Sequence, residues 1–310
     1  MEGILKERLA LKTPLILSGA MGTELERRNV EIGLPYWSAN ALIFQPEVVQ
    51  QIHEDYIEAG ADIIVTNTFR TNRRVFKSQN LPDRSLELTT KAVELAKSAR
   101  DKFPKRAILI AGCVAPVEDC YKPGLVPSEN ELNSEQYEMV TRLVKLGVDF
   151  LLIETMTTIR EAYAAAKAAK ETDKEFIVSF ACQKDGTLYG GEQLTDAVNV
   201  IAPLRPTLFS LNCISPRYLT SLVQQLKSVP PNSSGISDKV LNNSQIPFAV
   251  YGNVGNPDTR DGKIIQDVDE DEYVKFALEW KALGASIIGG CCGTTPEYIR
   301  RIVESMNPAN

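Results

Sequence analysis

The sequence has only one histidine, His53, among its 310 residues, so it excludes any mechanism that needs two histidines from this chain. It also has no apolar run close to the roughly 18 residues that a membrane-spanning helix requires. The first twenty residues carry scattered charges and lack the layout of a signal peptide. We therefore expect a cytoplasmic protein that does not insert into a membrane.

Positive charge is also in short supply, because 34 Lys and Arg face 40 Asp and Glu, a formal net charge of -6. Nucleic-acid binders usually carry a basic face, and anionic membranes attract basic segments. We therefore expect neither partner and favour a small-molecule ligand. No long exposed apolar helix is predicted that would indicate an obligate oligomer interface.

Short apolar segments rich in β-branched residues recur along the chain and alternate with amphipathic stretches. The eight predicted strands are 15–20, 61–69, 107–114, 149–156, 175–183, 207–213, 247–253 and 285–292. The eight predicted helices are 46–60, 85–102, 134–147, 159–171, 194–204, 216–227, 269–284 and 295–306. Strict alternation predicts an α/β fold, a single-domain (β/α)₈ TIM barrel over residues 1–310. The alternative, a doubly wound open sheet, would usually show G-x-G-x-x-G after a strand, and the sequence has none.

Two segments depart from this alternation. Residues 120–133 lengthen the connection after the third strand, and residues 228–245 are rich in Pro, Ser and Asn. Because the second segment leads into a strand, we expect a flexible surface insertion at the N-terminal face, away from the chemistry. A third unusual segment, 21–40, follows the first strand and should lie at the active face.

Three of the six cysteines are placed at predicted strand ends where they could meet. Cys213 ends the sixth strand, and Cys291 and Cys292 end the eighth. Active sites of such barrels form at the C-terminal ends of the strands. Adjacent residues of a regular strand point to opposite faces, so both cysteines can reach one ion only if the backbone bends. We expect the glycines around the pair, Gly289, Gly290 and Gly293, to allow the backbone angles of that bend.

Three thiolates select zinc (Zn²⁺), and three protein ligands leave a fourth position for a substrate. Three negative charges make zinc a poor activator of water but a good site for a substrate thiol, which loses its proton on coordination. We therefore predict nucleophilic attack by a thiolate on an alkyl group. The alternatives are an accidental cluster and a redox pair at Cys291 and Cys292, although the usual C-x-x-C spacing is missing.

The chain resembles the homocysteine S-methyltransferase family. The resemblance is carried by "LSGAMGTEL" (17–25), "YWSAN" (36–40), "GADIIVTNTFRTN" (60–72), "LLIETM" (151–156), "SLNC" (210–213) and "GGCCGTTPEYI" (289–299). It implies a barrel enzyme of methionine biosynthesis, with a zinc site to which Cys213, Cys291 and Cys292 correspond.

The resemblance also implies substrate contacts. Glu154 matches a family glutamate that holds the amino group of homocysteine, although it could form a simple ion pair. Asn67 could orient the amino acid or hold a loop. Trp37 could bind a sulfonium donor through its ring or cover the core.

One position departs from the family pattern. The family usually reads "LDGAMGTEL", and its aspartate helps to bind the homocysteine amine, whereas this chain has Ser18, followed by Gly19 in the same motif. A hydroxyl supplies no charge, so we predict weaker homocysteine binding or a different thiol substrate.

We therefore expect a zinc-dependent S-methyltransferase that moves a methyl group from S-methylmethionine or S-adenosylmethionine to homocysteine, giving methionine. No side chain is expected to act as a general acid or base. One alternative is a barrel component that takes the methyl group from a separate methyl-corrinoid protein. Another is a non-catalytic protein that binds zinc and thiols.

Overall fold

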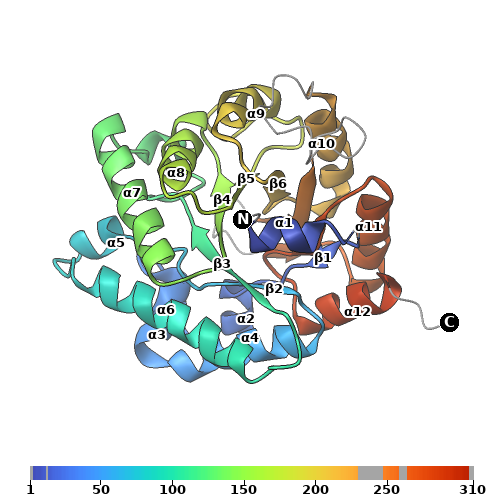
Figure 1. Cartoon of the computed structure of the whole chain (residues 1–310), viewed down its shortest axis with the longest axis horizontal. Coiled ribbons are helices and arrows are strands. Elements are labelled where there is room, and N and C mark those ends of the chain that lie inside the picture. Colours follow the sequence, from blue (N-terminus) through green and yellow to red (C-terminus); the bar gives the residue numbers. More distant parts are fainter. Residues whose placement is uncertain (1–2, 12, 230–246, 258–263, 307–310) are drawn as a thin grey trace.

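The computed structural model describes residues 3–11, 13–229, 247–257 and 264–306, and it contains the predicted barrel (Figure 1). Eight parallel strands lie in the order β1, β10, β7, β6, β5, β4, β3, β2. A parallel bridge between Leu17 and Ile63 joins the two ends of this order and closes the sheet. The barrel strands are β1 Leu15–Ile16, β2 Ile63–Val65, β3 Leu109–Val114, β4 Phe150–Met156, β5 Phe176–Phe180, β6 Leu208–Asn212, β7 Phe248–Gly252 and β10 Ile287–Gly290.

In the described part of the chain, eight larger helices surround the sheet, each overlapping a predicted helical stretch, and their apolar faces form the outer core. They are α4 Pro46–Glu58, α6 Arg84–Asp101, α7 Glu129–Lys145, α8 Ile159–Glu171, α9 Leu194–Ile201, α10 Pro216–Ser228, α11 Glu270–Ala282 and α12 Pro296–Met306. Alternation of strands and helices places every strand-to-helix loop at one end of the barrel. That end therefore collects the segments in which the sequence predicts chemistry.

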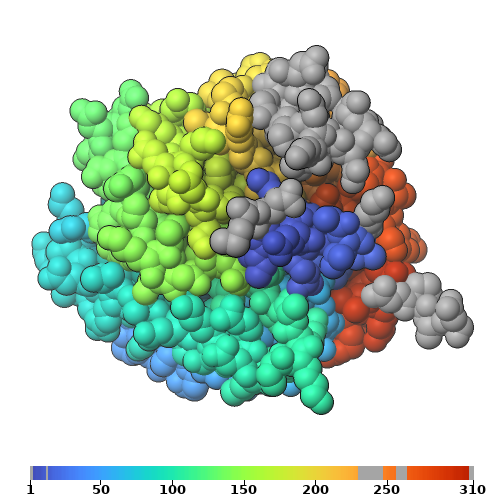
Figure 2. All heavy atoms as spheres, viewed as in Figure 1, coloured from blue at the N-terminus to red at the C-terminus, as the bar shows by residue number. Residues whose placement is uncertain are grey.

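The N-terminal helix α1, Ile4–Leu9, lies across the opposite end of the barrel, where Figure 1 shows it in front of the strands. Its Leu5 is fully buried against the inward-facing strand residues. The carboxylate of Glu175, just before β5, accepts hydrogen bonds from the N–H groups of Leu5 (2.8 Å) and Lys6 (3.0 Å). In the space-filling view of this face, α1 fills the centre (Figure 2). The α1 end of the barrel interior is thus covered, and the loop end remains for substrates.

Several elements were not predicted from the sequence. Helix α7 begins at Glu129 rather than near residue 134, because Ser128 and Glu131 form a capping box that starts the helix earlier. The additional short elements are α1, α2 Gly22–Arg27, η1 Trp37–Ala39, α3 Asn40–Phe44, α5 Arg73–Lys77, η2 Pro123–Leu125, η3 Ala202–Leu204, and an antiparallel ribbon of β8 Gly255–Pro257 and β9 Ile264–Gln266. Most of these lie in strand-to-helix loops, where hydrophobic periodicity is a weak guide.

Helix α10 ends at Ser228, and nearly all of the predicted insertion 228–245 lies outside the described residues. Among the described helices, none combines the length and the apolar character needed to cross a bilayer.

Candidate metal and substrate site

The three cysteines at the strand ends lie together at the loop end of the barrel. Cys213 directly follows β6, and Cys291 and Cys292 directly follow β10. Their Sγ atoms all lie within 4.8 Å of one another, and those of Cys213 and Cys292 are 3.8 Å apart. None of the six cysteines is in a disulfide. The fold therefore brings together thiols that are about eighty residues apart in the sequence.

The adjacent pair faces one point because the chain leaves the strand before it. Strand β10 ends at Gly290, and residues 291–294 form a turn in which the N–H of Thr294 donates to the carbonyl of Cys291 (3.1 Å). The Thr294 hydroxyl donates to the same carbonyl (2.7 Å), and the N–H of Gly293 donates to the Thr23 hydroxyl (2.8 Å). In a turn, successive side chains are not forced to opposite faces.

The expectation for the three glycines is only partly correct. Gly293 has a positive φ of 84°, a conformation that favours glycine, whereas Gly289 and Gly290 do not. At Gly289 an added Cβ would lie 2.6 Å from the Cβ of Leu17, and at Gly290 it would lie 2.3 Å from Oγ1 of Thr294. Glycine at these two positions leaves room for Leu17 and Thr294 and is not required by the backbone angles.

The cysteine from β6 has an unusual backbone of its own. Cys213 is 8% exposed and has a φ of 60°, in the left-handed region that costs a non-glycine residue free energy. Thr155, near the end of β4, has the same positive φ of 60°. The side chain of Asn212, the residue before Cys213, links the two strand ends. Its Oδ1 accepts from the Thr155 N–H (3.1 Å) and its Nδ2 donates to the Thr155 hydroxyl (2.9 Å). Asn212 therefore holds the ends of β4 and β6 in fixed relation.

Two further polar side chains contact the cluster, and the sequence analysis assigned a role to neither. The Tyr121 hydroxyl, in the loop after β3, lies 3.4 Å from Sγ of Cys213. Asn253, fully buried after β7, accepts the N–H of Cys292 on its Oδ1 (3.1 Å). Its Nδ2 has no partner of normal hydrogen-bond geometry among the described residues. Asn253 thus fixes the backbone of Cys292, and Tyr121 lies beside Cys213 on the other side of the cluster.

The electrostatics of the cluster favour a single negative charge when no cation is present. Hydrogen bonds from Cys291 and Cys292 lower the pKa of the Cys213 thiol. Hydrogen bonding to Cys213 in turn raises the pKa of Cys291 and of Cys292. The charge of Cys213 raises the pKa of Tyr121, so that its hydroxyl stays protonated and donates to the sulfur. Three thiolates would need a cation to balance them.

The donor set fits zinc. A tetrahedral site with Zn–S bonds of about 2.3 Å has sulfur atoms about 3.8 Å apart. The distance between the sulfurs of Cys213 and Cys292 is 3.8 Å, and Cys291 lies within the same cluster. Three soft, partly buried ligands without histidine are the set expected for such a site.

Glu154 lies near the end of β4, half-buried beside the cluster. The Tyr251 hydroxyl, from β7, donates to its Oε2 (3.3 Å). Burial raises the pKa of Glu154 to about 7, although hydrogen bonds from Cys113 and Tyr251 oppose that rise. Such a carboxyl would gain from an ammonium group, because a nearby positive charge favours its ionised form. Tyr251 is a further residue that the sequence analysis did not single out.

Ser18 and Gly19 lie at the end of β1, next to the turn of the cysteines. Ser18 is 4% exposed, and its N–H donates to the carbonyl of Ile63 (2.8 Å). An added Cβ at Gly19 would lie 2.7 Å from both the Thr294 and the Tyr56 hydroxyl oxygens. Gly19 thus has a packing reason to be glycine, because it lets β1 approach the turn.

Asn67 and Trp37 hold the segment that follows β1. Asn67 is buried, its Oδ1 accepts from the Ser38 hydroxyl (2.7 Å) and its Nδ2 donates to the Ser38 carbonyl (2.9 Å). These two bonds tie Asn67 to the segment that follows β1. Trp37 is half-buried and packs so closely that a Cβ at Gly22 would lie 2.4 Å from its ring, while the Phe69 ring meets it edge-on at 5.5 Å. The Trp37 ring thus packs against Gly22 and Phe69.

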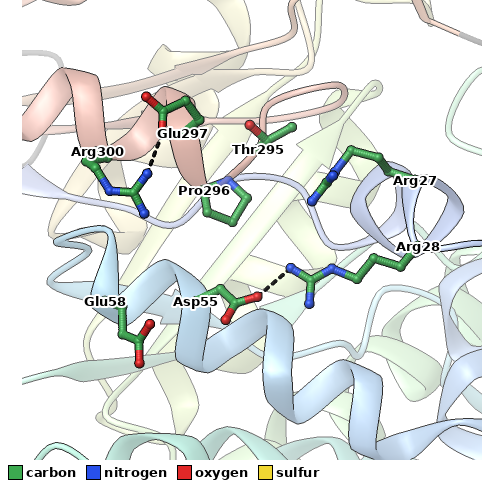
Figure 3. Close-up of a pocket in the computed structure, with 8 residues that line it drawn as sticks. All are labelled: Arg27, Arg28, Asp55, Glu58, Thr295, Pro296, Glu297 and Arg300. Carbon is green, nitrogen blue, oxygen red and sulfur yellow. Dashed lines mark hydrogen bonds and ion pairs between the residues drawn. The ribbon is translucent and has the colours of Figure 1, made fainter.

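A separate pocket of about 320 Å³ lies between α2, α4 and α12 (Figure 3). It is lined by Arg27, Arg28, Asp55, Glu58, Thr295, Pro296, Glu297 and Arg300. Arg28 pairs with Asp55 at 2.5 Å, and Arg300 pairs with Glu297. Since these charges balance each other and the lining contains no thiol, we place the chemistry at the cysteine cluster.

Comparison with known proteins gives one consistent result. The profile of the family described as homocysteine S-methyltransferase matches residues 15–306. Homocysteine S-methyltransferase 1 of Arabidopsis thaliana is 30% identical, over 93% of this chain and 91% of the relative. Selenocysteine methyltransferase of Astragalus bisulcatus is 28% identical, over 94% and 92%.

The fold comparison agrees. The crystal structure of the Escherichia coli homocysteine methyltransferase MmuM in its metallated form matches with a TM-score of 0.80 and 28% identity. The match covers 96% of this chain and 98% of that one. The similarity therefore extends over nearly the whole of both barrels.

Proposed function

Because this chain belongs to the homocysteine S-methyltransferase family, we propose that it moves a methyl group from a sulfonium donor, S-methylmethionine or S-adenosylmethionine, to the thiol of homocysteine, giving methionine. The chain is, like its family, an enzyme that methylates the thiol of homocysteine. The observation that carries the mechanism is the convergence of three thiols within 4.8 Å of one another at the loop end of the barrel.

In this proposal, Cys213, Cys291 and Cys292 hold zinc. With zinc bound there, the site would offer a fourth position at which a substrate thiol could lose its proton near neutral pH and stay electron-rich. The protein has to keep the three sulfurs in place and shield them. Asn253 serves this role through the N–H of Cys292, and Asn212 holds the strand ends that carry Cys213 and Glu154.

Glu154 holds the ammonium group of homocysteine. Its carboxyl is half-buried, and the Tyr251 hydroxyl fixes one of its oxygens. A charge-assisted hydrogen bond in this environment is stronger than one in water. Ser18, next to the cysteine turn, supplies no second charge, so the amine depends on Glu154 more heavily than in relatives that have aspartate at this position.

The proposal is tested by a panel of methyl donors. Protein loaded with zinc under reducing conditions is mixed with homocysteine and each donor, and methionine is measured by mass spectrometry. We expect methionine with at least one sulfonium donor, and neither methionine nor bound zinc with Cys292→Ala. The matched control is Cys182→Ala, a buried thiol outside the cluster, which should retain both.

Other outcomes reject parts of the proposal. Methionine formed only with a methyl-corrinoid protein would replace the sulfonium donor by that partner. Tight binding of zinc and homocysteine without methionine from any donor would make the chain a binding protein. Full activity of Cys292→Ala would reject the metal-based mechanism.

A further inference from the structure

Two tyrosines stand beside the thiol cluster, and the mechanism above uses neither ring. Tyr121 lies in the loop after β3, and Tyr189 lies in the loop after β5. Their ring centroids are 5.4 Å apart, with an interplanar angle of 78°. Tyr121 is 37% exposed and Tyr189 is half-buried, so a ligand can reach this aromatic corner from solvent.

The position of Tyr121 is tied to the reacting centre. Its hydroxyl is 3.4 Å from Sγ of Cys213, so Tyr121 lies next to a proposed zinc ligand. A methyl donor has to bring its sulfonium to the same thiol cluster. A donor that approaches a thiol bound at this cluster from the side of the loop after β3 therefore passes Tyr121.

The loops of both tyrosines are anchored by hydrogen bonds from their backbone N–H groups to residues that follow β4. In the loop of Tyr121, the N–H of Val117 donates to the Glu161 carboxyl (2.9 Å). In the loop of Tyr189, the N–H of Gly190 donates to the carbonyl of Thr157 (2.9 Å). The corner is thus prepared by the fold before any ligand binds, which reduces the entropy lost on binding.

An aromatic corner attracts a cation that has no hydrogens to donate. A sulfonium cannot form hydrogen bonds through its sulfur, but it is attracted to a ring face within about 6 Å of the centroid. The two rings meet edge to face, and both are partly exposed, so ring surface remains that a cation can contact. In the other aromatic pair at this end, Trp37 meets Phe69 edge-on and packs closely against Gly22.

We propose that Tyr121 and Tyr189 form the subsite for the positively charged group of the methyl donor, and that their rings, not a carboxylate, recognise it. This inference rests on the proposed function, because it assigns the donor side of the same site. Tyr121 and Tyr189 thereby select cationic donors over neutral ones.

The test compares Tyr121→Leu and Tyr189→Leu, which remove a ring, with Tyr121→Phe, which keeps the ring and removes the hydroxyl. Tyr137→Leu on α7, a tyrosine that is 49% exposed, is the control. The KM for the donor is measured at saturating homocysteine, and the KM for homocysteine at saturating donor. Zinc content and calorimetric binding of S-methylmethionine without homocysteine provide readouts that do not depend on turnover.

We expect each Leu variant to raise the donor KM and its dissociation constant about five- to thirtyfold. Tyr121→Phe should stay within about threefold of wild type, and zinc content and the KM for homocysteine should not change. As a second probe, tetramethylammonium should inhibit the wild type competitively against the donor and should inhibit Tyr121→Leu only weakly. Neutral tert-butanol should affect the wild type and Tyr121→Leu to the same small extent.

The results separate this inference from the proposed function. A wild type that forms no methionine from homocysteine with any donor rejects the proposed function. An active wild type whose donor KM is unchanged in both Leu variants rejects the aromatic subsite alone. Equal losses in Tyr121→Phe and Tyr121→Leu, a loss of zinc in either, or activity only with an uncharged donor would also overturn the subsite.

Discussion

The carboxyl of Glu161 offers a sharp test of the electrostatics around the site. Glu161 lies in the first turn of α8 and is 1% exposed. Its Oε1 accepts the N–H of Val117 and so holds the loop that carries Tyr121. Its buried Oε2 has no hydrogen-bond partner within the described ranges of the chain. Burial raises the pKa of Glu161 from 4.5 to about 7.

The sign of the effect follows from proton binding. Between pH 4.5 and 7 the folded protein holds the Glu161 proton more tightly than the unfolded chain does, so folding stability falls as the pH rises through this range. At about 1.4 kcal/mol per pKa unit, the raised pKa of Glu161 costs about 3 kcal/mol of folding stability at pH 8, where the buried carboxyl is ionised, and roughly half of that at pH 5.5, where folding requires it to be protonated. Glutamine has no charge to bury and can still accept the N–H of Val117.

We therefore expect Glu161→Gln to be more stable than wild type at pH 8, with an advantage that shrinks at pH 5.5, and to retain activity. The free energy of unfolding is measured in urea at both pH values. Glu94→Gln, an exposed position on α6, is the control and should follow the wild type. Equal pH dependence for wild type and Glu161→Gln, or a less stable variant at pH 8, would refute the reasoning.

Three further predictions concern the site itself. Ser18→Asp should lower the KM for homocysteine by adding a second carboxylate near the amine, and an unchanged KM would remove Ser18 from the substrate contacts. Glu154→Gln should raise the KM for homocysteine about ten- to a hundredfold, the range for losing a hydrogen bond between charged groups, with zinc content unchanged; a change confined to kcat would contradict its role in binding. Asn253→Ala should weaken zinc binding about ten- to a hundredfold in competition with a chelator, because residues that orient metal ligands have effects of this size; wild-type affinity would make Asn253 a packing residue only.

The barrel could be predicted because its signals are local. Each buried strand is a short apolar run, and each large helix repeats its apolar residues at helical spacing, so all eight of each lie where the pattern indicated. The meeting of Cys213 with the pair at 291–292 was predictable for the same reason, since parallel strands end at one face of a barrel.

The supporting residues could not be predicted, because their roles depend on contacts between distant loops. Tyr121 lies beside Cys213 in a loop that Glu161, on α8, anchors through Val117. Asn253 meets Cys292 across two neighbouring strand ends. Periodicity contains no information on such contacts.

The glycines beside the cysteines show a second limit of sequence reasoning. Their presence indicated a bend, but glycine serves both positive φ and close approach, and the sequence alone does not separate the two. The structure assigns Gly293 to the first reason, and Gly289 and Gly290 to the second. The short helix α2 could not be predicted for a different reason: it is only six residues long and lies within a loop, so it shows too little helical periodicity.

The central claim is that three cysteines of this chain hold one zinc ion with a position left for homocysteine. X-ray absorption at the zinc edge of protein purified and loaded under reducing conditions tests it most directly. We predict one zinc per chain with three sulfur neighbours at about 2.3 Å and a fourth sulfur once homocysteine is added. Failure to retain zinc, a first shell without sulfur, or a shell unchanged by homocysteine would contradict the account.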